Sequence, residues 1–180
     1  MPSLSGKKTM KVEEKKEESP SETETSTKEA KDTGKPKFDS SFKEYVEEVT
    51  NSVGPLPSQA EQIKSLATFV SNQMGGPVQN VSTFNHDLHI AQLKSDLKSN
   101  VIPIGFIKRG IFYHRALLFK ALADRIGVPA SLVRGEYNRA WNEVTLMEGG
   151  RANHYLVNLM DNPGSLLEVG GYAAGVYKKL

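Results

Sequence analysis

The sequence predicts an α+β fold, in which helices come first along the chain and an antiparallel sheet of short strands follows. Apolar residues recur with helical spacing twice between residues 41 and 74, and a third, nearly wholly apolar helical segment occupies residues 110–127. After residue 129 the helical spacing gives way to an alternating pattern. At 180 residues the chain has room for one such domain and a tail, so a single fold has to carry the function.

The first two helices are amphipathic and each has its own start signal. Ser41 and Glu44 have the spacing of a capping box, and the apolar stripe after them ends before a Gly-Pro pair. Ser58 and Glu61 repeat this spacing, and a Gly-Gly-Pro sequence ends the second stripe. The stripes consist of Phe42, Tyr45, Val46, Val49 and Val53, and of Ala60, Ile63, Ala67, Val70 and Met74. Both helices are therefore expected to cover an apolar surface.

The third helical segment is expected to be central. Residues 110–127 are apolar on two faces, and Gly127 followed by Pro129 supplies the end signal. A helix of this kind needs cover on both faces, which a superficial position does not provide. The preceding residues 78–100 could form a short helix, but polar residues interrupt the spacing of their apolar side chains, Leu88, Ile90, Leu93 and Leu97.

Four short segments after the central helix favour strands. They read ASLVRG, NEVTLM, HYLVNLM and SLLEV, and turn-rich pieces such as EGG and DNPG separate them. Successive strands joined by short turns pair antiparallel, so the central helix is expected to pack on an antiparallel sheet.

Residues 1–37 have a different composition from the rest of the chain. They contain no aromatic residue and few apolar ones, while Ser, Thr, Lys and Glu dominate. Such a segment cannot bury enough apolar surface to offset its ordering entropy, so a disordered linker is expected. Its ten serines and threonines leave open a docking segment controlled by phosphorylation. Residues 38–180 are expected to form the folded domain.

Composition excludes several classes of function. The chain has no cysteine, so disulfides, thiolate metal sites and a cysteine nucleophile are excluded. Its 23 basic and 21 acidic residues are too evenly balanced to predict nucleic-acid binding. No apolar run reaches the roughly 18 residues that a membrane helix requires, and no signal peptide or myristoylation glycine is present. We therefore expect a cytoplasmic protein without membrane insertion.

The polar residues suggest two further sites, each with a plainer structural interpretation. His86 and His89 could contribute to a metal site on a helix, but no further ligands are evident, so surface histidines are favoured over a metal. His114 lies near the start of the central helix, where a neutral, hydrogen-bonded histidine is favoured. The charged residues around this helix either pair internally, the favoured interpretation, or form a polar groove for a peptide: Arg115, Asp124, Arg125, Arg134, Glu136, Arg139 and Glu143. No metal and no cofactor are expected.

The segment from Val101 to Gly164 resembles a known family of domains. The pieces HRALLFK, ADRIG, LVRGEY, AWNEV and LMDNPG occur in the order and spacing of one peptidase-like domain. Plant Raf-like kinases of the ethylene-response and disease-resistance type share this domain with the C-terminal region of animal armadillo repeat-containing protein 3. The resemblance implies a papain- and transglutaminase-like core. No helical repeat of about 40 residues is present, so the chain resembles a C-terminal piece or short form of an armadillo-repeat protein.

The resemblance also implies where a catalytic triad would lie. Active relatives have a cysteine at the N-terminus of the central helix, a histidine in a His-Ala-Trp motif and an aspartate on the next strand. Phe112, Arg139 and Asn158 stand at these three positions. A phenyl ring has no nucleophilic atom, a guanidinium stays protonated near neutral pH, and an amide carries no charge to stabilise an imidazolium. The expectation is a pseudoenzyme.

A binding groove is expected at the head of the central helix. Phe112 and Tyr113 would form its apolar floor and Arg139 its cationic wall, with Trp141 nearby. Its occupant would be a protein or peptide of unknown identity, so the domain would act as a scaffold or protein-interaction module. One alternative is an active hydrolase with Ser131 or Tyr113 as nucleophile. Another is a structural component of a ciliary assembly, because the animal relative is associated with testis and motile cilia.

Overall fold

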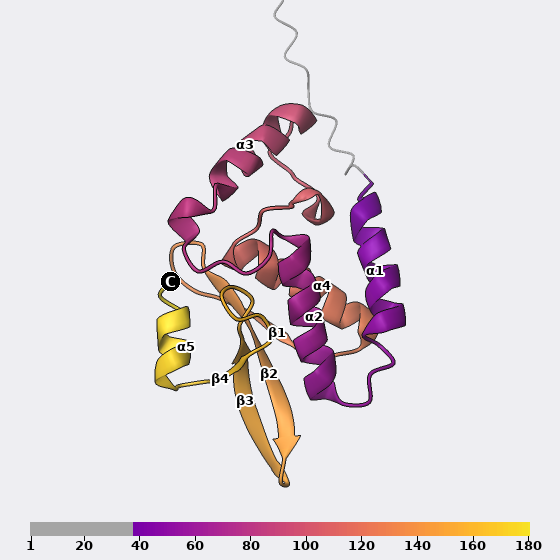
Figure 1. Cartoon of the computed structure of the whole chain (residues 1–180), viewed down its shortest axis with the longest axis vertical. Coiled ribbons are helices and arrows are strands. Elements are labelled where there is room, and N and C mark those ends of the chain that lie inside the picture. The colour runs from indigo at the N-terminus through magenta and orange to yellow at the C-terminus, as the bar shows by residue number, and fades with distance from the viewer. Residues whose placement is uncertain (1–37) are drawn as a thin grey trace, which may run out of the picture. The chain divides into compact units, whose positions relative to one another are not determined.

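The computed structural model describes residues 38–180, so the predictions made for residues 1–37 lie outside the described residues. The helices are α1 (Ser40–Ser52), α2 (Gln59–Gln73), α3 (His86–Leu97), α4 (Phe112–Ile126) and α5 (Tyr172–Tyr177). The strands are β1 (Ser131–Arg134), β2 (Ala140–Glu148), β3 (Arg151–Val157) and β4 (Leu166–Glu168). Four helices precede the strands, as Figure 1 shows, which confirms the predicted α+β fold. No helix in this part of the chain is long and apolar enough to cross a membrane.

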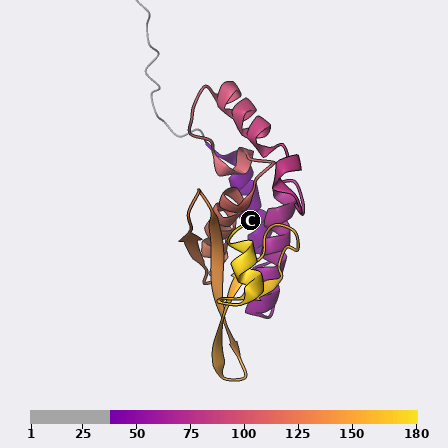
Figure 2. The same ribbon diagram turned by 90° about the vertical axis from the view of Figure 1, so that its left-hand side faces the viewer.

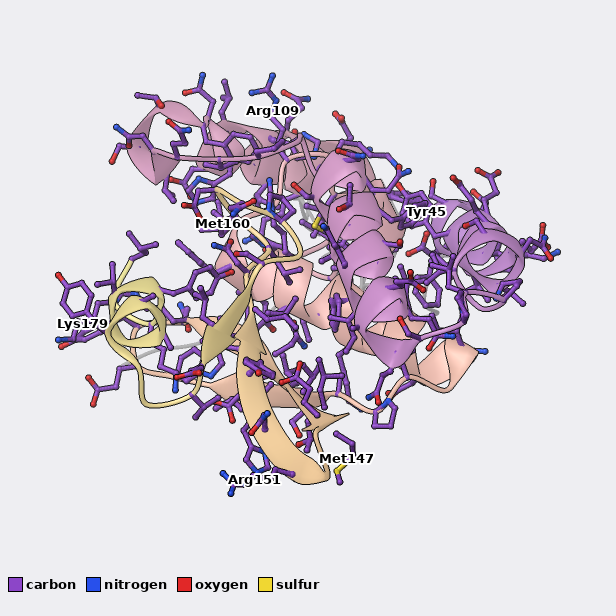
Figure 3. The ribbon with its side chains drawn as sticks, turned by 60° about the horizontal axis from the view of Figure 1, so that its bottom comes forward. Tyr45, Arg109, Met147, Arg151, Met160 and Lys179 are labelled. Carbon is purple, nitrogen blue, oxygen red and sulfur yellow. The ribbon has the colours of Figure 1, made fainter. Side chains whose placement is uncertain are left out.

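The strands form one antiparallel sheet in the order β1-β2-β3-β4. Gly149 and Gly150 join β2 to β3, with φ angles of 57° and 78° that match the left-handed backbone of a tight hairpin turn. The end of this hairpin extends beyond the helices (Figure 1), and Met147 and Arg151 lie at its tip (Figure 3). All four predicted strands are therefore present.

Helix α4 is the centre of the fold, as the sequence predicts. It packs against α1 and α2 on one side and against β1 and β2 on the other. Gly127, with a φ of 74°, ends the helix in the left-handed conformation. The main apolar core gathers buried side chains from α1, α2, α4 and the sheet, among them Val49, Ile63, Leu66, Phe119, Leu122, Val144 and Val157.

The residue that caps the N-terminus is the predicted one in α2 and a different one in α1. Ser58 caps α2 as predicted, because its hydroxyl accepts a hydrogen bond from the backbone N–H of Glu61 at 3.2 Å. The predicted cap of α1, Ser41, is wrong: the helix begins at Ser40 and its cap is Asp39, two residues before the predicted one, whose carboxylate accepts from the N–H of Phe42 at 2.8 Å. Its second oxygen accepts from the N–H of Gly105 at 2.7 Å. Asp39 thus joins α1 to the 3₁₀ turn at Ile104–Phe106.

The two faces of the sheet have different cover. Asn142, Val144 and Val157 point toward α4, where they are buried. Their neighbours Trp141 and Leu156 point to the opposite face, because side chains alternate along a strand. Helix α5 covers this second face near the strand ends, and Figure 2 shows it in front of the sheet. The fold therefore has α4 on one face of the sheet and the short α5 on the other.

Candidate functional site

The first residue of α4 is buried by the chain's own C-terminal helix. Phe112 is 7% exposed, and its ring meets that of Tyr177 edge to face, with 5.9 Å between ring centroids. Around this pair lies a second apolar cluster formed with Val78, Leu156, Met160 and Ala174. The position that the resemblance assigns to a nucleophile is therefore occupied by a hydrocarbon ring packed against another aromatic ring.

Tyr177 also binds the loop that follows β3. Its hydroxyl accepts a hydrogen bond from the backbone N–H of Leu159 at 3.1 Å. Burial raises the pKa of Tyr177 to about 12, so the phenol stays neutral near pH 7. A buried neutral phenol with a fixed partner holds α5 in place and supplies no reactive oxygen to the head of α4.

Arg139 and Trp141 contact the residue after α5. An Nη1–H of Arg139 donates to the carbonyl oxygen of Lys178 at 3.3 Å. The ammonium of Lys178 lies 4.9 Å from the centroid of the Trp141 ring and 3.4 Å from an oxygen of Glu143. Glu143 in turn accepts from the indole N–H of Trp141 at 3.0 Å. Arg139 therefore stabilises the end of α5, and it does so from the strand position that the resemblance assigns to a histidine.

Asn158 is buried and its side chain is fully engaged in a local turn. Its amide nitrogen donates to Asp161 at 2.7 Å, and its amide oxygen accepts from the N–H of Met160 at 2.9 Å. It directly follows β3, whose register pairs Val157 with Asn142, so Asn158 lies at the same end of the sheet as Trp141. The structure thus brings Phe112, Asn158 and Trp141 around α5, where Arg139 also binds.

The expected groove floor of Phe112 and Tyr113 is not formed. Tyr113 lies on another side of α4, where the guanidinium of Arg134 stacks at 5.5 Å from its ring centroid. The helix turns by about 100° per residue, so adjacent side chains at its start point in different directions. Ser131, the other residue considered as a nucleophile, lies exposed at the start of β1 opposite Glu143. Within residues 38–180 no histidine or carboxylate is hydrogen-bonded to its hydroxyl.

Two hollows flank α5 in place of the expected groove. We call the first the Phe112 hollow; it measures about 560 Å³ and is lined by Val78, Asn80, Phe112, Met160, Asp161 and Leu180, among others. The second, the Tyr172 hollow, measures about 360 Å³ and includes Asn158, Asp161, Leu167, Tyr172 and Val176. Between them lies the outer face of α5 and the residues after it, where Tyr172, Val176 and Leu180 are 90%, 41% and 51% exposed. Their spacing of four residues places them on one stripe.

Arg115 is the most deeply buried charge among the described residues, and its partners are neutral. The side chain is completely buried, and its donors reach the carbonyl oxygens of Gly110 at 2.7 Å, Leu159 at 2.7 Å, Met74 at 3.0 Å and Gly76 at 2.7 Å. A fifth bond, of 3.1 Å, goes to the hydroxyl of Ser71. Burial lowers the pKa of Arg115 to about 10, which still leaves it charged near pH 7. It therefore joins α4 to the end of α2 and to the loop after β3.

Two of the remaining charged residues around α4 form ion pairs within the fold. Asp124 pairs with Lys120 one turn earlier at 2.6 Å, and Glu143 pairs with Lys178. Together with Arg115 and Arg139, these contacts support the structural interpretation of the charge-dense set over a polar peptide groove.

The three histidines near α3 and α4 do not assemble a metal site. His86 contacts Asp87 at 3.2 Å, and Nε2 of His89 accepts from the backbone N–H of Lys108 at 2.9 Å. Nδ1 of His114 accepts from the N–H of Ile111 at 3.2 Å, and burial lowers the pKa of His114 to about 4. His114 is thus the neutral, hydrogen-bonded histidine that was favoured. Within residues 38–180 no group of three or more His, Cys, Asp or Glu residues could hold a metal ion.

Sequence reasoning missed α5, which supplies most of the contacts at this site. Its six residues include Gly175 in the middle, so local propensity favours no helix. The available signal was the repeat of apolar residues every four positions at Tyr172, Val176 and Leu180.

Comparison with known proteins gives a consistent family. A model of the EDR1/CTR1/ARMC3, peptidase-like, family matches residues 32–167. The chain is 50% identical over 154 residues to human armadillo repeat-containing protein 3, a match that covers 79% of this chain and 18% of that protein. It is 34% identical over 138 residues to the serine/threonine-protein kinase CTR1 of Arabidopsis thaliana, covering 72% of this chain and 16% of that kinase.

These matches cover less than a fifth of each relative's own length. No solved structure matches the fold. The family match includes the whole of α4 and all of the catalytic positions that the resemblance assigns, and it ends before α5. The chain therefore belongs to the EDR1/CTR1/ARMC3 peptidase-like family.

Proposed function

We propose that this chain is a catalytically inactive peptidase-like domain that acts as a protein-interaction module of an armadillo-repeat protein. The observation that carries the proposal is the burial of Phe112 against Tyr177 at the head of α4. Covalent catalysis by this family's architecture needs an accessible nucleophile there and a base beside it. Phe112 supplies no nucleophilic atom, and the guanidinium of Arg139 is a hydrogen-bond donor with no acceptor site for a proton.

The interaction surface that we propose is the outer stripe of α5 together with the two hollows beside it. Tyr172, Val176 and Leu180 expose apolar area that the fold leaves uncovered. Burying such area stabilises a complex by about 25 cal/mol per Å² before the costs of association are counted. Asp161 lines both hollows, so a partner segment with apolar side chains and one basic residue fits this surface.

Affinity purification with quantitative mass spectrometry tests the proposal. Val176→Asp places a charge on the α5 stripe, while Met147→Asp places the same charge at another exposed apolar residue, on the hairpin tip. Proteins that bind through α5 are recovered with wild type and with M147D, and recovery falls at least fivefold with V176D. Equal recovery with all three chains contradicts the proposal.

Arg139→Glu tests the same region from the sheet side. The glutamate removes the bond to the Lys178 carbonyl and leaves two acceptors facing each other, so α5 loosens and partner recovery falls. Unchanged recovery would exclude Arg139 from the interaction.

A separate experiment addresses the competing hydrolase function. Broad hydroxyl-directed probes are expected to leave the wild-type chain unlabelled. A covalent adduct at Ser131 or Tyr113 would overturn the assignment of inactivity.

The resemblance also motivates a cytoplasmic location with a role in cilia or flagella of germ cells. Co-sedimentation of the chain with microtubule doublets tests this part of the proposal. A chain that stays in the supernatant at all salt concentrations is a soluble adaptor rather than a structural component.

A further inference from the structure

A separate groove lies on the other side of the α4 head, beneath α3. Its walls come from α3, from residues 100–107 and from the outer side of α4, and its volume is about 560 Å³. This value falls in the range of small-molecule sites, about 300 to 1,000 Å³. Helix α3 has no buried residue and rests on the domain chiefly through Ile90 and Leu93. We call this the Tyr113 groove, and neither the family match nor the residues around α5 assign it a role.

The walls of the Tyr113 groove are mainly aliphatic. Ile90, Ile102, Ile104 and Leu117 line it and are each half-buried, while Ile107 is buried at its base. Half-buried aliphatic side chains that converge on one hollow favour an apolar occupant, because the occupant removes their remaining exposed surface from water.

The polar side chains of the groove are those of Lys94, Asn100, Tyr113 and His114, and each of them can donate a hydrogen bond. Nδ1 of His114 accepts from the Ile111 N–H, so in the neutral ring the proton lies on Nε2, and this N–H is a donor. Lys94 adds an ammonium, and Tyr113, whose ring lies under the Arg134 guanidinium, adds a hydroxyl. None of the residues that line the groove is an aspartate or a glutamate. The groove thus combines apolar walls with hydrogen-bond donors and one positive charge, that of Lys94, and has no acidic side chain in its lining.

We propose that the Tyr113 groove binds a small apolar carboxylate, with its hydrocarbon part against the isoleucines and its carboxylate near Lys94 and His114. The charge complementarity selects this occupant over a neutral or cationic one, since a carboxylate accepts from ammonium, imidazole and hydroxyl donors at once. The site goes beyond the proposed interaction function, because it shares no lining residue with the hollows beside α5.

Octanoate, with octan-1-ol as an uncharged probe of equal chain length, tests the site on the full chain. Nuclear magnetic resonance titration is expected to show saturable shifts at Leu117, Ala121 and the His114 ring, with octanoate binding at least fivefold more tightly than octan-1-ol. Equal affinities for the two probes, or octanoate shifts confined to the residues around α5, would overturn the proposal. So would the absence of any saturable shift at millimolar octanoate.

Two substitutions identify the groups that bind. Lys94→Gln is expected to weaken octanoate binding about threefold to fivefold, as an exposed ion pair is worth up to about 1 kcal/mol, and to leave octan-1-ol binding unchanged. Lys98→Gln, also exposed on the end of α3 but outside the groove, is the matched control. Ala121→Phe fills the groove and abolishes octanoate binding; if that variant does not fold, Leu117→Glu serves, since its carboxylate repels the probe. Equal binding by K94Q and K98Q contradicts the role of Lys94.

Discussion

Removing the Arg115 guanidinium is expected to destabilise the domain strongly. In Arg115→Met a side chain of similar length replaces the guanidinium, and three carbonyl oxygens, those of Gly76, Gly110 and Leu159, lose the bond that the structure gives them. The Met74 carbonyl keeps a second donor, the N–H of Gly110 at 3.2 Å. Each buried carbonyl left without a donor costs about 1 to 3 kcal/mol.

The net effect is smaller than the sum of these costs. Burying a cation is itself unfavourable, and its replacement by an apolar group returns about 1 to 4 kcal/mol. Taken at the middle of both ranges, the balance for Arg115→Met is a loss of about 3 to 4 kcal/mol in the free energy of unfolding. For a domain of this size that corresponds to a fall in the melting temperature of about 10 °C or more.

Urea unfolding followed by far-ultraviolet circular dichroism measures this loss. Arg125→Met is the matched control, because Arg125 is exposed in the last turn of the same helix and its loss is expected to change stability by less than about 0.5 kcal/mol. Arg115→Lys keeps the charge but offers three donors for five bonds, so it falls between the two. If R115M unfolded within 1 kcal/mol of R125M, the interpretation of Arg115 as the main polar link between α2, α4 and the β3 loop would be refuted.

Three further predictions follow from buried polar groups. Tyr177→Phe leaves the Leu159 N–H without its acceptor, so the free energy of unfolding in urea is expected to fall by about 1 to 2 kcal/mol. In the wild-type chain, nuclear magnetic resonance is expected to find Tyr177 still protonated at pH 11. The pKa of His114 is about 4 in the folded state and about 6.5 in the unfolded state, so the unfolded state binds a proton first as the pH falls. The free energy of unfolding therefore decreases from pH 7 toward pH 4. In thermal melts at a series of pH values, His114→Gln is expected to make this decrease smaller. Asn142→Asp places a carboxylate oxygen next to the carbonyl oxygen of Ala116, to which the Asn142 amide donates. We expect the free energy of unfolding to fall by about 3 kcal/mol at pH 7 and by less at pH 4. The urea midpoints of variant and wild type at each pH measure this difference.

The helices and strands that bury a clear apolar stripe could be predicted from the sequence. The pattern in α2 and α4 reflects nearly complete burial of one face, and local chemistry marks their ends at Ser58 and Gly127. The predicted cap of α1 is two residues away from the observed one, because Asp39, Ser40 and Ser41 are three consecutive candidates. Which of them caps depends on a distant contact, the N–H of Gly105, that no local pattern contains.

The site could be predicted only in part, for a related reason. The resemblance locates Phe112, Arg139 and Asn158, and the structure places them around one element. That element, α5, forms because its residues contact Phe112, Leu159 and Arg139, rather than through its own propensity. The expected floor of Phe112 and Tyr113 failed because adjacency in sequence is not adjacency on a helix surface.

Arg115 and Tyr177 bind the backbone of the same residue, Leu159, through its two flanking peptide units. The Leu159 carbonyl accepts from Arg115, and the Leu159 N–H donates to Tyr177, so the loop next to Asn158 is fixed from α4 and from α5 at once. Arg115 lies within the family match, whereas Tyr177 lies beyond its end at residue 167. Substitution of Arg115 therefore acts on the fold that the family shares, and substitution of Tyr177 acts on the cover of Phe112.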